Sequence, residues 1–178
     1  MASSKGAQFA ALALRIFVFF FSLVALIILA TTTVTVPDPE SETGKSKLRF
    51  KDVLAYRYLF SVAIIGCAYA LIQIPISALS ITKGKKIISR KALRLYIFAD
   101  LVFALLLASG AGAGFGLTVD LKRAFNKVFK AAGLQDDPLV TDVNKALNLV
   151  HASTGCILMA AVCMAFVVLI STSALAKK

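Results

Sequence analysis

Two ionisable residues of opposite charge stand inside long apolar stretches of this sequence. Arg15 lies within FAALALRIFVFFF, and Asp100 lies within YIFADLVF. A lone charge near the centre of a membrane-spanning helix costs about 2.5–3.5 kcal/mol, so each needs a partner or a route to water. Arg15 follows Phe9 by six positions, and Asp100 follows Arg94, the last basic residue before its run, by six. At 1.5 Å per residue, both lie about 9 Å deep from the same membrane surface. We therefore predict an intramembrane ion pair between Arg15 and Asp100, with a mainly structural role.

Two other readings of these charges remain open. The long Arg15 side chain can reach the headgroups alone, although the short Asp100 side chain cannot easily do so. A proton or ion relay is the other alternative, but a relay would need more polar residues along a path than Tyr69, Gln73 and a few Ser and Thr. An ion pair that sets helix contacts and register therefore explains both charges most simply.

No reactive cluster accompanies the pair. His151 is the single histidine and has no Cys or acid at metal-ligand spacing, and the chain has no CxxC, HExxH or GxSxG motif. Cys67, Cys156 and Cys163 all fall within apolar runs, which argues against a disulfide framework. We expect no catalytic residue, no metal and no cofactor, and hence a protein that is not an enzyme and has no evident small-molecule substrate.

Alternating glycines mark the segment ASGAGAGFG at residues 108–116. Gly110 and Gly114 form one GxxxG pair, and Gly112 and Gly116 form a second. No Lys-Ser or Lys-Thr follows, so this is not a phosphate-binding loop. In a membrane helix, small residues at this spacing let backbones approach closely. The four glycines are therefore candidates for a helix-packing face within the bundle or for an oligomer face between protomers.

These residues must be positioned by membrane-spanning helices. Of the 178 residues, 59% are apolar, and the mean hydropathy is +0.85. A span needs about 20 apolar residues to cross about 30 Å of hydrocarbon as a helix. Four runs satisfy this requirement, at residues 9–36, 56–81, 95–119 and 150–176. We predict a single all-α domain over 1–178, an integral membrane four-helix bundle in contact with the lipid bilayer.

The distribution of charge predicts the orientation of the bundle. The connection between the second and third runs has no acidic residue but six basic ones: Lys83, Lys85, Lys86, Arg90, Lys91 and Arg94. By the positive-inside rule, this basic loop and both termini are cytoplasmic. The loop could also attract anionic lipid headgroups, at about 1 kcal/mol per residue. The net charge of +11 thus has a topological explanation, and we expect no nucleic-acid partner.

The two outer connections differ in character. Residues 37–52 contain Pro, Gly and mixed charge, which is typical of an extended connector. Residues 120–149 include an amphipathic helix, because apolar side chains recur at helical spacing at Leu121, Phe125, Val128, Phe129 and Ala132. This short helix is predicted to lie on the membrane surface or to cover the outer end of the bundle. Tyr56, Tyr58 and Tyr96 fall at the edges of the runs and are interpreted as membrane-belt residues.

The chain resembles the Casparian strip membrane protein-like (CASP-like) family of plants and, more distantly, MARVEL-type four-helix proteins. The resemblance covers nearly the whole chain and is most specific in FKDVLAYRYLFSVAIIGCAYALIQI (50–74), in ASGAGAGFGLTVDLK (108–122), and in the placement of Arg15 and Asp100, which match the family's Arg and Asp. It implies a plasma-membrane scaffold that forms homo- and hetero-oligomers with related four-span proteins and organises a membrane subdomain linked to local cell-wall modification. A small channel or transporter subunit, with a polar path around Arg15 and Asp100, is the alternative.

Overall fold

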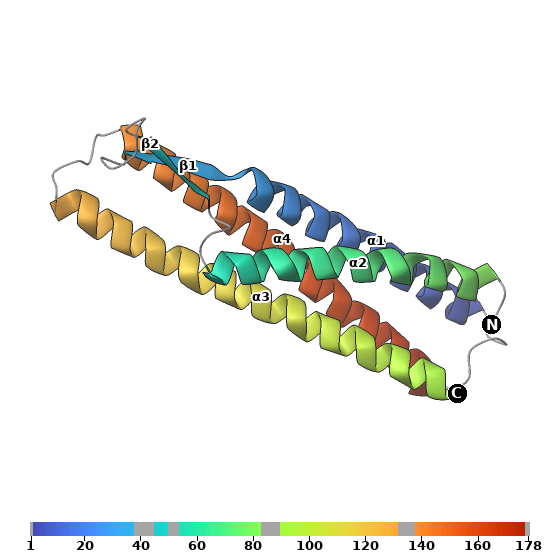
Figure 1. Cartoon of the computed structure of the whole chain (residues 1–178). Coiled ribbons are helices and arrows are strands. Elements are labelled where there is room, and N and C mark those ends of the chain that lie inside the picture. The colour runs from blue at the N-terminus through green and yellow to red at the C-terminus, as the bar shows by residue number, and fades with distance from the viewer. Residues whose placement is uncertain (1, 38–44, 50–53, 83–89, 132–137, 177–178) are drawn as a thin grey trace.

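A computed structural model describes residues 2–37, 45–49, 54–82, 90–131 and 138–176, which form four long helices and one short two-stranded sheet (Figure 1). The helices are α1 (Ala2–Thr31), α2 (Leu54–Thr82), α3 (Arg90–Ala131) and α4 (Pro138–Ala176). The antiparallel strands β1 (Thr33–Pro37) and β2 (Lys45–Arg49) lie between α1 and α2 in the chain.

The four helices pack side by side as an antiparallel bundle. α1 lies against α2 and α4, and α3 packs along α4 with a smaller contact to α2. Both chain ends lie at the same end of the bundle (Figure 1). Every helix contains a segment long and apolar enough to cross a membrane, at Gly6–Thr31, Tyr56–Leu79, Arg94–Ala131 and Val140–Ser173. The predicted four-helix membrane bundle is confirmed.

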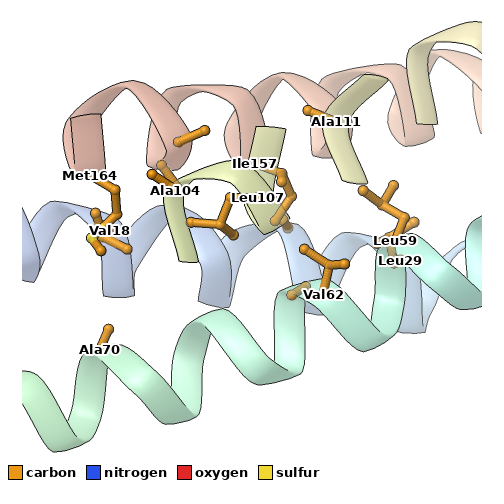
Figure 2. Close-up of a cluster of buried hydrophobic side chains, with 14 of the residues drawn as sticks. Val18, Leu29, Leu59, Val62, Ala70, Ala104, Leu107, Ala111, Ile157 and Met164 are labelled. Carbon is orange, nitrogen blue, oxygen red and sulfur yellow. The ribbon is translucent and has the colours of Figure 1, made fainter. Parts of the chain in front are cut away.

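Aliphatic side chains fill the centre of the bundle (Figure 2). Five of the largest are at most 1% exposed: Val18, Leu59, Leu107, Ile157 and Met164. Large apolar side chains also cover the outside, for example Phe17, Phe20, Leu105 and Leu169, which are 52–63% exposed. In water such a surface would drive aggregation, whereas lipid tails are as apolar as these side chains. The exposed apolar side chains therefore form the lipid-facing surface.

The first helix ends earlier than the sequence predicts. The apolar run was expected to continue as helix to residue 36, but α1 ends at Thr31 and β1 begins at Thr33. The cause lies in the segment TTTVTV, because β-branched residues lose side-chain freedom in a helix and suit a strand. A short hairpin thus occupies part of the region for which we predicted an extended connector, and β1 contacts the start of α4.

The predicted amphipathic segment is helical, but it is not a separate helix. α3 continues without a break from Arg90 to Ala131, because no Pro or Gly interrupts residues 117–130. Leu121 and Phe125 pack against a small cluster on α4, formed by Val143, Ala146 and Leu147. α4 itself begins at Pro138, twelve residues before the predicted start of the fourth span. The segment therefore extends the bundle instead of lying on the membrane surface.

Candidate functional site

The structure brings Arg15 and Asp100 together in the interior of the bundle. Arg15 lies on α1 and Asp100 on α3, two helices that each pack mainly against α2 and α4. Arg15 Nη2 lies 2.5 Å from Asp100 Oδ2, and the two residues are 4% and 0% exposed. The ion pair therefore reaches across the bundle and links two helices that otherwise make little contact.

Three hydroxyl groups complete the contacts of the pair. Tyr69 on α2 donates a hydrogen bond to Asp100 Oδ1 at 2.6 Å. On the other side, Arg15 Nη1 donates to Ser77 Oγ on α2 and to the hydroxyl of Tyr96 on α3. Both charged groups are thus hydrogen-bonded as well as paired, which is the condition under which buried charges are tolerated.

Sequence reasoning missed two of these three hydroxyls. Tyr96 was interpreted as a membrane-belt residue, and Ser77 was not singled out. The signal lies in helical spacing: Tyr69, Gln73 and Ser77 recur every four residues on α2, and Tyr96 precedes Asp100 by four on α3. Residues at this spacing share one helix face, so a polar row opposite a buried charge could have identified them.

The belt interpretation is also wrong for Tyr56. This residue is 1% exposed, and its hydroxyl lies 3.0 Å from Thr118 Oγ1 on α3, so it joins two helices inside the half of the bundle that carries the β-hairpin. Tyr58 behaves differently, because it is 41% exposed and its hydroxyl lies 2.8 Å from Ser109 Oγ on the lipid-facing surface. The two tyrosines, two positions apart, thus lie on different faces of α2.

Unpartnered polar atoms remain beside the ion pair. Within the described part of the chain, Arg15 Nε and Gln73 Oε1 have no hydrogen-bond partner, although both residues are at least 95% buried. Gln73 lies on α2 one turn from Tyr69 and one turn from Ser77, which contact opposite ends of the pair. Both Asp100 oxygens are hydrogen-bonded, to Arg15 and Tyr69, so the unpartnered atoms lie on the Arg15 and Gln73 side chains.

The four glycines of α3 divide into two rows on opposite sides of the helix. A Cβ at Gly110 would lie 2.9 Å from Val62 Cγ1, and one at Gly114 would lie 2.8 Å from Thr154 Oγ1, so this pair packs against α2 and α4. A Cβ at Gly112 or Gly116 would meet nothing within 4 Å. Residues two apart lie about 200° apart around a helix, which explains the division. The structure therefore assigns the inner row to packing and leaves the outer row open.

The residues of the basic loop lie mostly outside the described part of the chain. Lys83, Lys85 and Lys86 fall in residues 83–89, while Arg90, Lys91 and Arg94 occupy the first turns of α3. Arg94 is exposed. The first turns of α3 lie at the same end of the bundle as both chain termini, which agrees with the even number of helices (Figure 1).

Neither the cysteines nor the acidic residues form a metal centre in the described residues. No group of three His, Cys, Asp or Glu side chains comes together there. Cys67, Cys156 and Cys163 are free thiols within the helices. His151 is exposed, and its ring meets the ring of Phe115 edge-on at 4.8 Å. The ion pair with its hydroxyls and the two glycine rows are therefore the features from which a function must be argued.

The sequence is similar to those of known plant membrane proteins. The family model of the Casparian strip membrane protein domain matches residues 4–163. The CASP-like protein 4D1 of Sorghum bicolor is 41% identical over 142 residues, which cover 72% of this chain and 73% of the relative. The CASP-like protein 4D2 of Arabidopsis thaliana is 37% identical over 132 residues, which cover 74% and 71%. No solved structure matches the chain. With most of its length matched by the family model, the chain belongs to the family of proteins with a Casparian strip membrane protein domain.

Proposed function

We propose that this chain is a non-enzymatic plasma-membrane scaffold, which self-associates and organises a membrane subdomain linked to local modification of the cell wall. Membership of a family of membrane proteins supports the membrane part of this proposal. The positive-inside rule supports an orientation with both termini and the basic loop at residues 83–94 in the cytoplasm. The end of the bundle that carries the β-hairpin then faces the cell exterior.

The outer glycine row carries the proposal of self-association. Gly112 and Gly116 lie in open space, and the exposed Ala108 extends the same row by one turn. Each glycine weakens a helix by about 1 kcal/mol relative to alanine, so two of them on a face without packing partners reduce stability within the protomer. In a bilayer, helices associate through close backbone approach at such small residues. A second helix packed on this row would offset the loss.

A conducting path receives less support from the same structure. Asp100 is held by Arg15 and Tyr69, and the buried polar side chains elsewhere in the described interior are uncharged hydroxyls, such as Ser22, Ser153 and Thr154. Val62, Leu107 and Ile157 are at most 1% exposed and fill the middle of the bundle (Figure 2). Moving a charge through such a layer is expensive, because aliphatic side chains and a few hydroxyl groups do not replace the water around an ion. The scaffold therefore explains the buried polar cluster more simply than a channel does.

Counting protomers in a bilayer tests the proposal. The protein, labelled with one fluorophore per chain, is reconstituted at low density into liposomes and bleached one molecule at a time. Wild type is expected to bleach in several steps, and Gly112→Leu/Gly116→Leu in one step. The thermal stability of this variant should not fall, because a Cβ at either position meets nothing within 4 Å and leucine favours a helix more than glycine does.

Gly155→Leu provides the matched control. It introduces the same side chain at a glycine of α4 that also has open space around it. It is expected to leave the number of bleaching steps unchanged. Single-step bleaching of wild type, or equal loss of association in the control, would contradict self-association through α3.

A further inference from the structure

Two helices extend well beyond the rest of the bundle at the end that carries the β-hairpin. Tyr56, near the start of α2, lies at the same height along the bundle axis as Thr118 of α3, because the two hydroxyl groups are hydrogen-bonded. α3 continues from there to Ala131, about 20 Å further at 1.5 Å per residue. Figure 1 shows α3 and α4 continuing past the start of α2. We call residues 120–131 and 138–149 the projecting hairpin.

The projecting hairpin carries an excess of positive charge. Its basic residues are Lys122, Arg123, Lys127, Lys130 and Lys145, and its acidic residues are Asp120 and Asp142; all seven side chains are exposed. None of them forms an ion pair with a described residue, and Lys122 alone has a side-chain hydrogen bond, to Asn148 Oδ1 at 3.1 Å. Asp136 and Asp137 lie outside the described residues. The cations of α3 therefore have no counter-charge among the described residues.

A groove of about 290 Å³ opens near the tip of the projecting hairpin. Among the described residues it is lined by Asn126, Phe129 and Lys130 of α3 and by Val140 of α4. The Phe129 ring is held in place by stacking on Phe125, with centroids 5.9 Å apart. The groove thus combines an aromatic ring, an amide and an ammonium group in a small space, and the exposed Lys127 follows Asn126 in the sequence.

We infer that the groove and the cations around it form a docking surface for an acidic polysaccharide, a polymer of uronic acid units. Lys127 and Lys130 match the carboxylates, the Asn126 amide can bond to sugar hydroxyls, and the Phe129 ring offers an apolar face to the sugar ring. This inference rests on the proposed function, because it requires the projecting hairpin to face the cell wall.

Other occupants fit the surface less well. A second copy of the hairpin would bring like charges together, which is unfavourable. The lipid headgroups of the protein's own membrane fit less well, because Phe129 lies about 15 Å along α3 beyond residue 119, the predicted end of the third span, at 1.5 Å per residue. The headgroup layer is only about 5–8 Å thick on each side. An acidic protein would match the charge but has no special need for an aromatic ring and an amide in a narrow groove. A uronic acid polymer can contact the Phe129 ring, the Asn126 amide and the Lys130 ammonium group together.

Binding to a defined polymer tests the inference. The protein, in nanodiscs of zwitterionic lipid, is immobilised and exposed to polygalacturonate or to its fully methyl-esterified form, which has the same backbone without the charge. Wild type is expected to bind the acidic polymer and not the ester, with affinity falling as salt is raised. Lys127→Gln/Lys130→Gln should weaken binding by about tenfold, the size expected for two exposed charge contacts.

Two further variants distinguish binding at the groove from nonspecific attraction to positive charge. Lys83→Gln/Lys85→Gln removes the same charge from the segment that follows Thr82 in the sequence, where α2 ends about 39 Å along its axis from Tyr56 at 1.5 Å per residue. This change should alter affinity by less than about twofold, because about 39 Å far exceeds the Debye length. Asn126→Ala keeps every charge and should weaken binding of polygalacturonate but not of polyaspartate. All substituted residues are in exposed positions or outside the described residues, and thermal unfolding checks that each variant is folded.

Three outcomes would overturn the inference. They are an absence of binding by wild type, equal loss in the two lysine pairs, and tighter binding of polyaspartate than of polygalacturonate, which would point to an acidic protein instead. Bleaching steps counted on the same preparations report on self-association separately. Polymer binding therefore tests the docking surface, and the number of bleaching steps tests self-association, so that either proposal can be refuted without the other.

Discussion

Removing one member of the buried ion pair should strongly destabilise the protein. In Asp100→Leu, the guanidinium of Arg15, which is 4% exposed, loses its one counter-charge among the described residues, and the Tyr69 hydroxyl loses its acceptor. Stranding one partner of a buried ion pair typically lowers the free energy of unfolding by about 3–5 kcal/mol. Arg15→Leu should have a similar effect, because it leaves the fully buried Asp100 carboxylate unpaired.

The double variant Arg15→Leu/Asp100→Leu should recover much of this loss. It leaves no unpaired charge, and only the hydroxyls of Tyr69, Ser77 and Tyr96 lose partners, at about 1 kcal/mol each. We expect the double variant to be more stable than either single variant. The reversed pair, Arg15→Asp/Asp100→Arg, should also recover part of the loss, because hydroxyl groups can both donate and accept hydrogen bonds.

Reversible unfolding in mixed micelles of mild detergent and dodecyl sulfate measures these free energies. As a control, Arg15→Leu is combined with Ser153→Ala, which removes a hydrogen bond to Ala25 in the other half of the bundle. The effects of this distant pair should add to within about 0.5 kcal/mol. If Arg15→Leu and Asp100→Leu were equally additive, the two residues would act separately, and the account of the pair would be wrong.

Further predictions use the same unfolding measurement. Gly114→Ala should lower the free energy of unfolding by about 1–3 kcal/mol, since its Cβ would lie 2.8 Å from Thr154 Oγ1, whereas Gly112→Ala should be neutral or stabilising by up to about 1 kcal/mol. Equal losses at the two glycines would contradict the two-row arrangement. Tyr69→Phe should lower the free energy by about 1–3 kcal/mol, because its hydroxyl bonds to a buried charge, and Tyr58→Phe by less, because its bond is exposed. A larger loss at Tyr58 would refute this ranking.

Much of the fold follows from patterns within single segments. The four helices could be predicted because an apolar run of about 20 residues with few charges has few stable alternatives to a membrane helix. The pairing of Arg15 with Asp100 could be predicted because both charges fall at the same depth, where each is unfavourable alone. These predictions need only the length of a run, the position of a charge and the side from which each helix starts.

The remaining features depend on how each helix is rotated about its axis. The segment ASGAGAGFG does not indicate which of its two glycine rows faces α2. The structure shows that the row of Gly110 does, because a Cβ there would lie 2.9 Å from Val62 Cγ1. The same holds for Tyr96, which lies near the end of its span and could face headgroups or the interior. The end of α1 at Thr31 and the length of α3 were missed for a different reason, because hydropathy reports membrane depth and not where a helix stops.

The mobility of the protein in its own membrane tests the scaffold most directly. A fluorescent copy in the plasma membrane of a plant cell is bleached in a small area, and recovery is followed for wild type, Gly112→Leu/Gly116→Leu and the control Gly155→Leu. We expect slow, incomplete recovery for wild type and the control, and fast recovery for the double glycine variant. Fast and complete recovery of wild type, at the rate of a freely diffusing four-helix monomer, would contradict the proposed function.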